Sequence, residues 1–179
     1  MRFTTGSKDR EQALTDLFTD TFTASEGAEA GTRIGQFVRA LIATTPAGDL
    51  FAFQAYESGT LRGAIFFSRL SYPQDHRTVF ILSPVAVDRA CQGQGIGQQL
   101  IAHGLDALRA QGADIAMTYG DPAFYGKIGF RPVTEQVVPA PLPLNLPQGW
   151  LGQSLTDQPL SPLTGPATCV PALDDPELW

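Results

Sequence analysis

The sequence predicts a mixed α/β fold of the α+β kind, in which helices flank a central, mostly antiparallel sheet. The hydrophobic patterns change between strand and helix periods in the order β-α-α-β-β-β-α-β-α-β, with one more strand after them. The apolar stretch Val79–Val87 is also followed by a helical pattern and then by a second apolar stretch, Ile115–Tyr119. A strand–helix–strand crossover of this kind places one parallel pair within the sheet.

The first half of the chain supplies a short strand, two helices and a hairpin. We expect a strand at Arg2–Thr5 and then a helix capped by Ser7 or Asp9. The apolar side of this helix would consist of Leu14, Leu17, Phe18 and Phe22. A loop at Thr23–Thr32 would lead to a second helix, whose apolar face carries Ile34, Phe37, Val38, Leu41 and Ile42. The loop is predicted because its residues are small and polar. Strands at Leu50–Tyr56 and Leu61–Leu70 then form the hairpin.

The second half begins with the strand Val79–Val87 and a helix with an apolar face made of Ile96, Leu100, Ile101, Leu105 and Leu108. Asp121-Pro122 is a helix-start signal, and strands are expected at Phe130–Val133 and Trp150–Thr156. Nine of the 14 prolines lie beyond Val138. We therefore expect residues 1–136 to form the domain and residues 137–179 to form a proline-rich extension that packs on it.

Composition excludes several classes of function. The net charge is −6, and lysine occurs only as Lys8 and Lys127, so nucleic acid and anionic membranes are poor partners. Cys91 and Cys169 are far apart and suggest no disulfide framework. No apolar signal segment or membrane-length apolar run is present. The expected location is the cytoplasm.

A glycine-rich segment, Gln92–Gly97, joins the strand Val79–Val87 to the helix that follows. Three glycines in five residues remove the Cβ atoms that would keep a phosphate from the backbone, and the helix N-terminus favours an anion. A plain tight turn is the alternative. Dinucleotide binding is disfavoured because its third glycine position is Gln98, and a nucleotide P-loop is disfavoured because the segment has no lysine.

Two motifs stand in order in this part of the chain: Gln-x-x-Gly-x-Gly after Val85-Ala86-Val87, and Asp121–Phe130 with its Phe-Tyr and Gly-Phe pairs. Together they resemble the motifs of the GNAT superfamily of N-acetyltransferases. The resemblance covers Val79–Pro132. It implies a GNAT-like sheet in which the two parallel strands, Val79–Val87 and Ile115–Tyr119, splay apart to admit the cofactor, acetyl-coenzyme A.

The same resemblance assigns roles to individual residues. Gln92, Gly93, Gln94, Gly95, Ile96 and Gly97 would hold the pyrophosphate of coenzyme A, the backbone of Val85, Ala86 and Val87 would hold the pantetheine arm, and Phe124 would also contact the cofactor. Tyr125 would protonate the departing thiolate, for which a phenol is a suitable acid. The alternative for Tyr125 is a half-buried ring that closes the core.

The general base stays open. Glu57, Asp88 and Asp121 lie near strand ends, but Asp121 is also explained as a helix cap and Glu57 as turn surface. His76 and His103 have no partner pattern, and His103 is expected on the surface. Two histidines without ligand spacing predict no metal site.

The sequence therefore predicts an N-acetyltransferase that moves an acetyl group from acetyl-coenzyme A to an amine of a small molecule or peptide, by direct attack in a ternary complex. A non-catalytic acyl-coenzyme A-binding or regulatory module is the alternative. Sheet edges and the apolar extension also leave a homodimer possible.

Overall fold

The computed structural model describes residues 1–179, which group into two units. The first unit contains Met1–Phe67 and Pro84–His103, and the second contains Ser68–Ser83 and Gly104–Trp179. Three elements, β3 (Thr60–Ser71), β4 (Val79–Val87) and α3 (Ile96–Ala110), contribute residues to both units. No helix is both long enough and apolar enough to span a membrane.

The strands form the mixed, mostly antiparallel sheet that the sequence predicts. In the first unit the strand order is β1 (Arg2–Thr5), β2 (Leu50–Glu57), β3 and β4. In the second unit the strand order is β4, β5 (Ile115–Tyr119), β7 (Trp150–Ser154) and β6 (Arg131–Pro132). The short strand β8 (Thr168–Cys169) pairs with β3. The pairs β1–β2, β3–β8, β5–β7 and β6–β7 are antiparallel. The pair β4–β5 is parallel, as expected for the crossover through α3.

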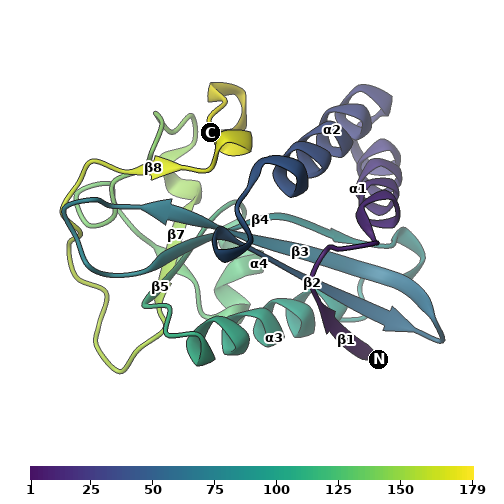
Figure 1. The fold of residues 1–179 in the computed structure, drawn as a ribbon, viewed down its shortest axis with the longest axis horizontal. Coiled ribbons are helices and arrows are strands. Elements are labelled where there is room, and N and C mark those ends of the chain that lie inside the picture. The colour runs from purple at the N-terminus through teal and green to yellow at the C-terminus, as the bar shows by residue number, and fades with distance from the viewer. The chain divides into compact units, whose positions relative to one another are not determined.

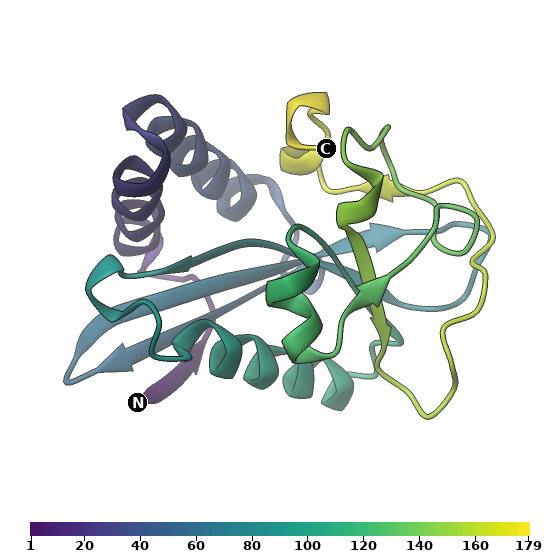
Figure 2. The same cartoon turned by 180° about the vertical axis from the view of Figure 1, so that it is seen from behind.

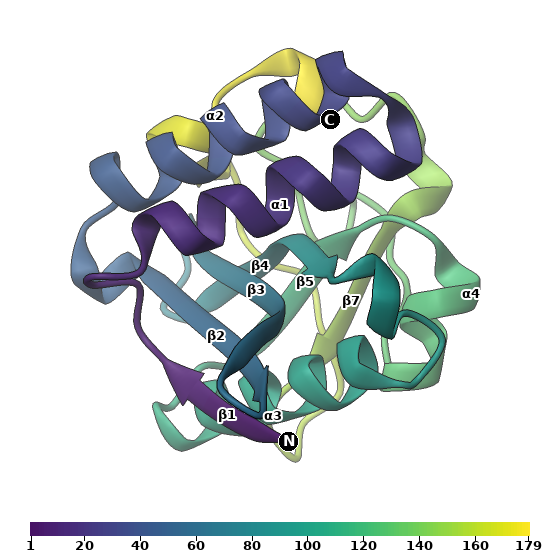
Figure 3. The same cartoon turned by 90° about the vertical axis from the view of Figure 1, so that its right-hand side faces the viewer.

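Two long helices, α1 (Glu11–Glu26) and α2 (Ala28–Thr44), lie side by side along one face of β2 and β3, and the first half of α3 lies on the other face (Figures 1 and 3). The loop predicted at Thr23–Thr32 is wrong, because only Gly27 separates the helices. Gly27 has φ 100°, which reverses the chain in a single residue.

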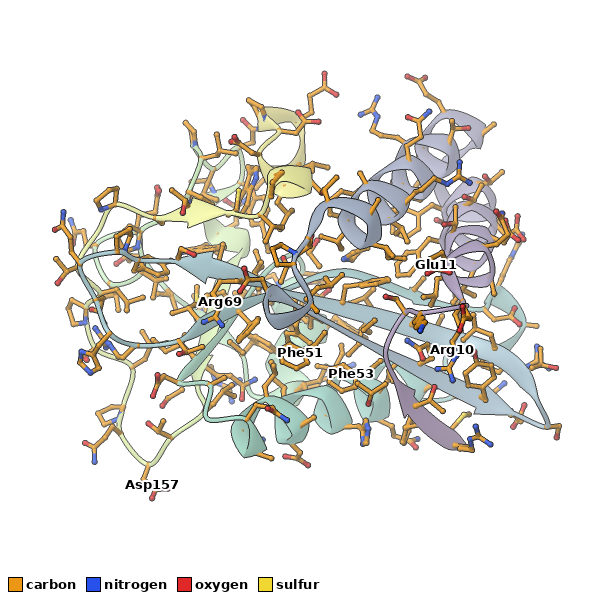
Figure 4. The ribbon with its side chains drawn as sticks, in the orientation of Figure 1. Arg10, Glu11, Phe51, Phe53, Arg69 and Asp157 are labelled. Carbon is orange, nitrogen blue, oxygen red and sulfur yellow. The ribbon has the colours of Figure 1, made fainter.

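The expected helix cap is also wrong. Arg10 occupies the N-cap position of α1, and no side chain caps the helix. Asp9 has φ 61° in the turn before it. The guanidinium of Arg10 instead donates to Thr4 Oγ1 at 2.9 Å and to Gln54 Oε1 at 2.7 Å, which ties the start of α1 to β1 and β2 (Figure 4).

The core of the first unit is aromatic on both faces of its strands. Phe18 of α1 packs on Phe66 of β3, with ring centroids 5.8 Å apart. On the other face, His103 of α3 stacks on Phe3 at 5.0 Å and meets the edge of Phe53 at 5.7 Å. His103 is half-buried, so its expected surface position is wrong, and it serves as a flat packing partner.

The second unit holds the short helix α4 (Pro122–Tyr125), the three strands β5, β7 and β6, and the C-terminal segment (Figure 2). Asp121 caps α4 by accepting the Ala123 N–H at 2.8 Å, and Pro122 occupies the first helical position, as predicted. Short 3-10 turns of the chain lie at Ala47–Asp49, Arg89–Cys91, Gly126–Ile128, Pro147–Gly149, Pro171–Leu173 and Pro176–Leu178.

Candidate functional site

The glycine segment Gln92–Gly97 belongs to the first unit and follows β4 through one 3-10 turn. Asp88 caps that turn by accepting the Ala90 N–H at 3.0 Å. Gly93 and Gly95 then take φ values of 76° and 77°, a left-handed conformation that side chains with a Cβ rarely adopt. A Cβ on Gly93 would meet no atom within 4 Å, so the backbone here is open to a ligand.

The start of α3 supplies the electrostatics of this site. Its first backbone hydrogen bond runs from Gln99 N to Gly95 O at 3.0 Å. The N–H groups of Ile96, Gly97 and Gln98 precede that bond and have no acceptor within the helix. Because the dipole of a 15-residue helix also ends here, the segment suits an anion such as a phosphate.

The predicted strand and loop residues lie together in the first unit. The side-chain amide of Gln92 donates to Val87 O at 3.1 Å, which fixes the glycine segment against the end of β4. Gly63 of β3 was not anticipated from the sequence. A Cβ at Gly63 would lie 3.3 Å from Ala86 O and 3.5 Å from side-chain atoms of Ile96 and Leu100. Its small size therefore lets β3, β4 and α3 pack closely behind the site.

An ion pair supports the turn before the glycine segment. Arg62 of β3 donates to Asp88 Oδ2 at 2.6 Å, and Glu57 lies 3.8 Å from the same guanidinium. The hydrogen bond from Ala90 N and the bond from Arg62 hold the pKa of Asp88 below its usual range. Asp88 is thus a weak proton acceptor with two structural partners, which argues against it as the general base.

Tyr125 and Phe124 lie on α4 in the second unit. The Tyr125 ring meets Phe124 at 5.0 Å and Phe130 at 5.9 Å, both edge-on. It also covers Gly120, where a Cβ would lie 2.6 Å from Tyr125 Cε2. The ring is therefore part of a packed aromatic cluster, which leaves the hydroxyl as the group available for chemistry.

The Tyr125 hydroxyl interacts with the side chain of Thr118 on the neighbouring strand β5, and Thr118 Oγ1 donates to Leu82 O at 3.0 Å. Burial raises the pKa of Tyr125, and the charge of Asp121 raises it further, while the interaction with Thr118 lowers it. The phenol consequently stays protonated beyond its ordinary range, as a general acid requires.

The remaining candidates have structural roles or none. Asp121 caps α4, His76 is exposed, and His103 is packed between aromatic rings. No group of three or more His, Cys, Asp or Glu side chains is placed to hold a metal ion.

Residues 11–130 match the Acetyltransferase (GNAT) family. The chain therefore belongs to this family of acyltransferases. Among curated relatives, it is 33% identical over 162 residues to the uncharacterized N-acetyltransferase YjhQ of Escherichia coli (strain K12), with 84% of this chain and 89% of the relative covered.

Two solved structures have the same fold. A GNAT family N-acetyltransferase (YhbS) from Escherichia coli in complex with CoA matches with a TM-score of 0.80 and 22% identity, covering 97% of this chain and 92% of that one. A GNAT family acetyltransferase from Brucella melitensis in complex with acetyl-CoA matches with a TM-score of 0.74 and 25% identity, covering 97% of both chains.

Proposed function

We propose that this protein transfers the acetyl group of acetyl-coenzyme A to the amine of a small molecule or peptide. The observation that carries the proposal is the glycine segment Gln92–Gly97 at the start of α3. In a chain of the GNAT family, this segment combines two left-handed glycines with open backbone and unpaired helix N–H groups.

The residues fit coenzyme A without a lysine clamp. The N–H groups of Gly93–Gly97 would bind the pyrophosphate, with Gln92, Gln94 and Ile96 fixing the shape of the segment. The backbone of Val85, Ala86 and Val87 would bind the pantetheine arm, and Phe124 would contact the cofactor. Acetyl-coenzyme A, when bound, supplies an activated thioester, and the protein's part is to hold it, exclude water and supply a proton.

Direct attack by the amine is favoured because neither cysteine suits an acyl-enzyme intermediate. Cys91 is only 6% exposed. Burial, followed by the charge of Asp174, raises the pKa of Cys169 to about 11. A thiol of that pKa is almost entirely protonated at neutral pH and reacts slowly as a nucleophile. The acetyl group would therefore pass from coenzyme A to the amine in one ternary complex.

Steady-state kinetics test this function. Purified protein is mixed with acetyl-coenzyme A and candidate amines, and free thiol release is followed while both substrates are varied. Intersecting double-reciprocal lines support a ternary complex, and parallel lines would contradict it. Tight binding of coenzyme A without thiol release for any amine would contradict the transferase proposal and favour the binding module.

Tyr125 carries the sharpest prediction about mechanism. If its phenol protonates the leaving thiolate, Tyr125→Phe should lower kcat by about 100- to 10,000-fold, because the variant loses the acid and keeps the ring. The affinity for acetyl-coenzyme A should stay unchanged in calorimetric titration. A kcat within threefold of wild type would leave Tyr125 with the packing role alone.

The pH profile gives a second readout of the same role. The pKa of Tyr125 is raised, so the phenol loses its proton only above the ordinary value of about 10. We expect kcat to fall on the alkaline side above about pH 10, after subtraction of uncatalysed hydrolysis, and we expect Tyr125→Phe to lack this limb. An identical limb in the variant would assign it to another group.

Two further expectations belong to this proposal. The burial of Leu163, Val170, Leu173 and Trp179 supports a C-terminal extension, residues 137–179, that packs on a domain of residues 1–136. A homodimer remains an expectation, and sedimentation equilibrium of the full chain would test it.

A further inference from the structure

A pocket of about 420 Å³ lies in the second unit, at the end of β5. One wall is the turn from β5 into α4, and the other is the segment before β7. Its lining includes Tyr119, Gly120, Asp121 and Pro122 on the first wall and Leu146 and Gly149 on the second. The volume falls in the range of small-molecule sites.

Hydrogen bonds hold the two walls in place. The Leu146 N–H donates to the Tyr119 hydroxyl at 2.6 Å, and the Gly120 N–H donates to Gly149 O at 3.0 Å. Glycine at 149 permits this close approach, because a Cβ there would lie 3.1 Å from Gly120 O and 3.2 Å from the Tyr119 ring. The pocket is therefore a built feature of the backbone.

Tyr119 is supported from behind by the C-terminus of the chain. Its ring stacks on Trp179 at 6.2 Å and meets Trp150 at 6.5 Å. The indole N–H groups donate to Leu173 O and Val138 O, respectively, both at 2.9 Å. Because Trp150 and Trp179 are at most 3% exposed, they form a fixed aromatic support for the pocket wall.

The lining is mostly apolar, with the amide of Gln148 and one charged side chain, Asp121. Leu146 is 60% exposed, which is unusual for a large apolar side chain in this chain. Asp121 is exposed, and one of its oxygens caps α4. With a net charge of −6 on the chain, this carboxylate complements a single cation beside an apolar group.

The pocket also adjoins the proposed acid. Gly120 lines the pocket and is covered by the Tyr125 ring. We propose that this pocket receives the acceptor, and that the acceptor is an amine with an apolar aliphatic or aromatic group, which binds as its ammonium ion and loses one proton to solvent before its nitrogen attacks the thioester. This inference rests on the proposed function. A compact polycation would gain little here, because the lining offers one carboxylate and a large apolar surface.

Acceptor kinetics with matched variants test the inference. Phenethylamine serves as the apolar monoamine and spermidine as the polycation. Leu146→Ala removes apolar lining, and Asp121→Asn removes the charge but keeps the helix cap, since asparagine caps as well as aspartate. Leu144→Ala is the control, because it truncates a leucine of the same segment that does not line the pocket.

We expect phenethylamine to have the higher kcat/KM in the wild-type protein. Leu146→Ala should raise its KM about tenfold, Asp121→Asn about threefold, and Leu144→Ala should leave it unchanged. The KM for acetyl-coenzyme A should not move in any variant.

Two results would overturn the inference in different ways. If amines are acetylated but spermidine is preferred, or if Leu146→Ala and Leu144→Ala behave alike, the acceptor binds elsewhere and the proposed function survives. If neither amine nor any other candidate releases thiol, the proposed function fails and the inference fails with it.

Discussion

Two glycine-rich stretches of the first unit have similar composition but different structures. In α2, Gly31 and Gly35 lie four residues apart and face α1, where a Cβ on Gly31 would come within 2.7 Å of Thr19 O. Before α3, Gly93 and Gly95 lie two residues apart, have positive φ, and face open space or only the tip of Gln99.

The spacing separates the two roles. Glycines four apart share one helix face and permit close packing of a second helix. Glycines two apart cannot share a helix face, and here each supplies a backbone conformation that other residues avoid. The first stretch therefore contributes to stability, and we propose that the second contributes to cofactor binding.

The largest expected effect is on the second stretch. Gly95→Val places a β-branched residue at φ 77° and should remove at least two charge-assisted bonds to the pyrophosphate. Such bonds contribute about 1.5–3 kcal/mol each, so affinity for coenzyme A should fall about 100-fold or more. Calorimetry gives the affinity, and circular dichroism should show an intact fold. An affinity for coenzyme A within a few-fold of wild type would show that Gly95 is not needed to bind the cofactor.

Gly31→Val should have the opposite profile. The added side chain meets the backbone oxygen of Thr19, so overpacking should lower the free energy of unfolding by about 2–3 kcal/mol. Urea unfolding measures this loss, and Thr32→Val is the control because Thr32 is exposed on the same helix. The folded variant should bind coenzyme A normally. Unchanged stability would show that α1 and α2 do not need the glycine.

The smallest effect is expected at Gly35. Its nearest neighbour is the Thr19 side chain rather than backbone, and alanine is about 1 kcal/mol better than glycine inside a helix. Gly35→Ala should therefore change the free energy of unfolding by less than about 1 kcal/mol. In a Thr19→Ala background it should be stabilising. A loss as large as that of Gly31→Val would mean that the helices cannot adjust at either position.

Much of the fold could be predicted because the hydrophobic residues of its strands and helices recur with clear periods. The bounds of β4 and β5 agree with the apolar runs Val79–Val87 and Ile115–Tyr119. The loop predicted at Thr23–Thr32 failed because small polar residues also suit a tight helix pair, which is a tertiary property. The two-residue strand β8 pairs only Thr168 and Cys169 and is too short to have a period.

The candidate site was predictable only where the backbone or a local signal defines it. The glycine spacing and the Asp121-Pro122 cap are local. The Arg62–Asp88 ion pair joins residues 26 positions apart, and Trp179 reaches Tyr119 from the end of the chain. Such contacts depend on the fold, and the sequence alone contains no pattern that reveals them.

The central claim is that the backbone of the glycine segment binds the pyrophosphate of coenzyme A. Calorimetric titration of coenzyme A into Gly93→Ala and Gly112→Ala tests it most directly. Gly93 and Gly112 have φ values of 76° and 82°, both have no atom within 4 Å of a Cβ, and they flank opposite ends of α3. The conformational cost, about 1–2 kcal/mol, should be the same in both. We expect Gly93→Ala to weaken binding about tenfold and Gly112→Ala to leave it unchanged. Equal affinities for the two variants would contradict the claim.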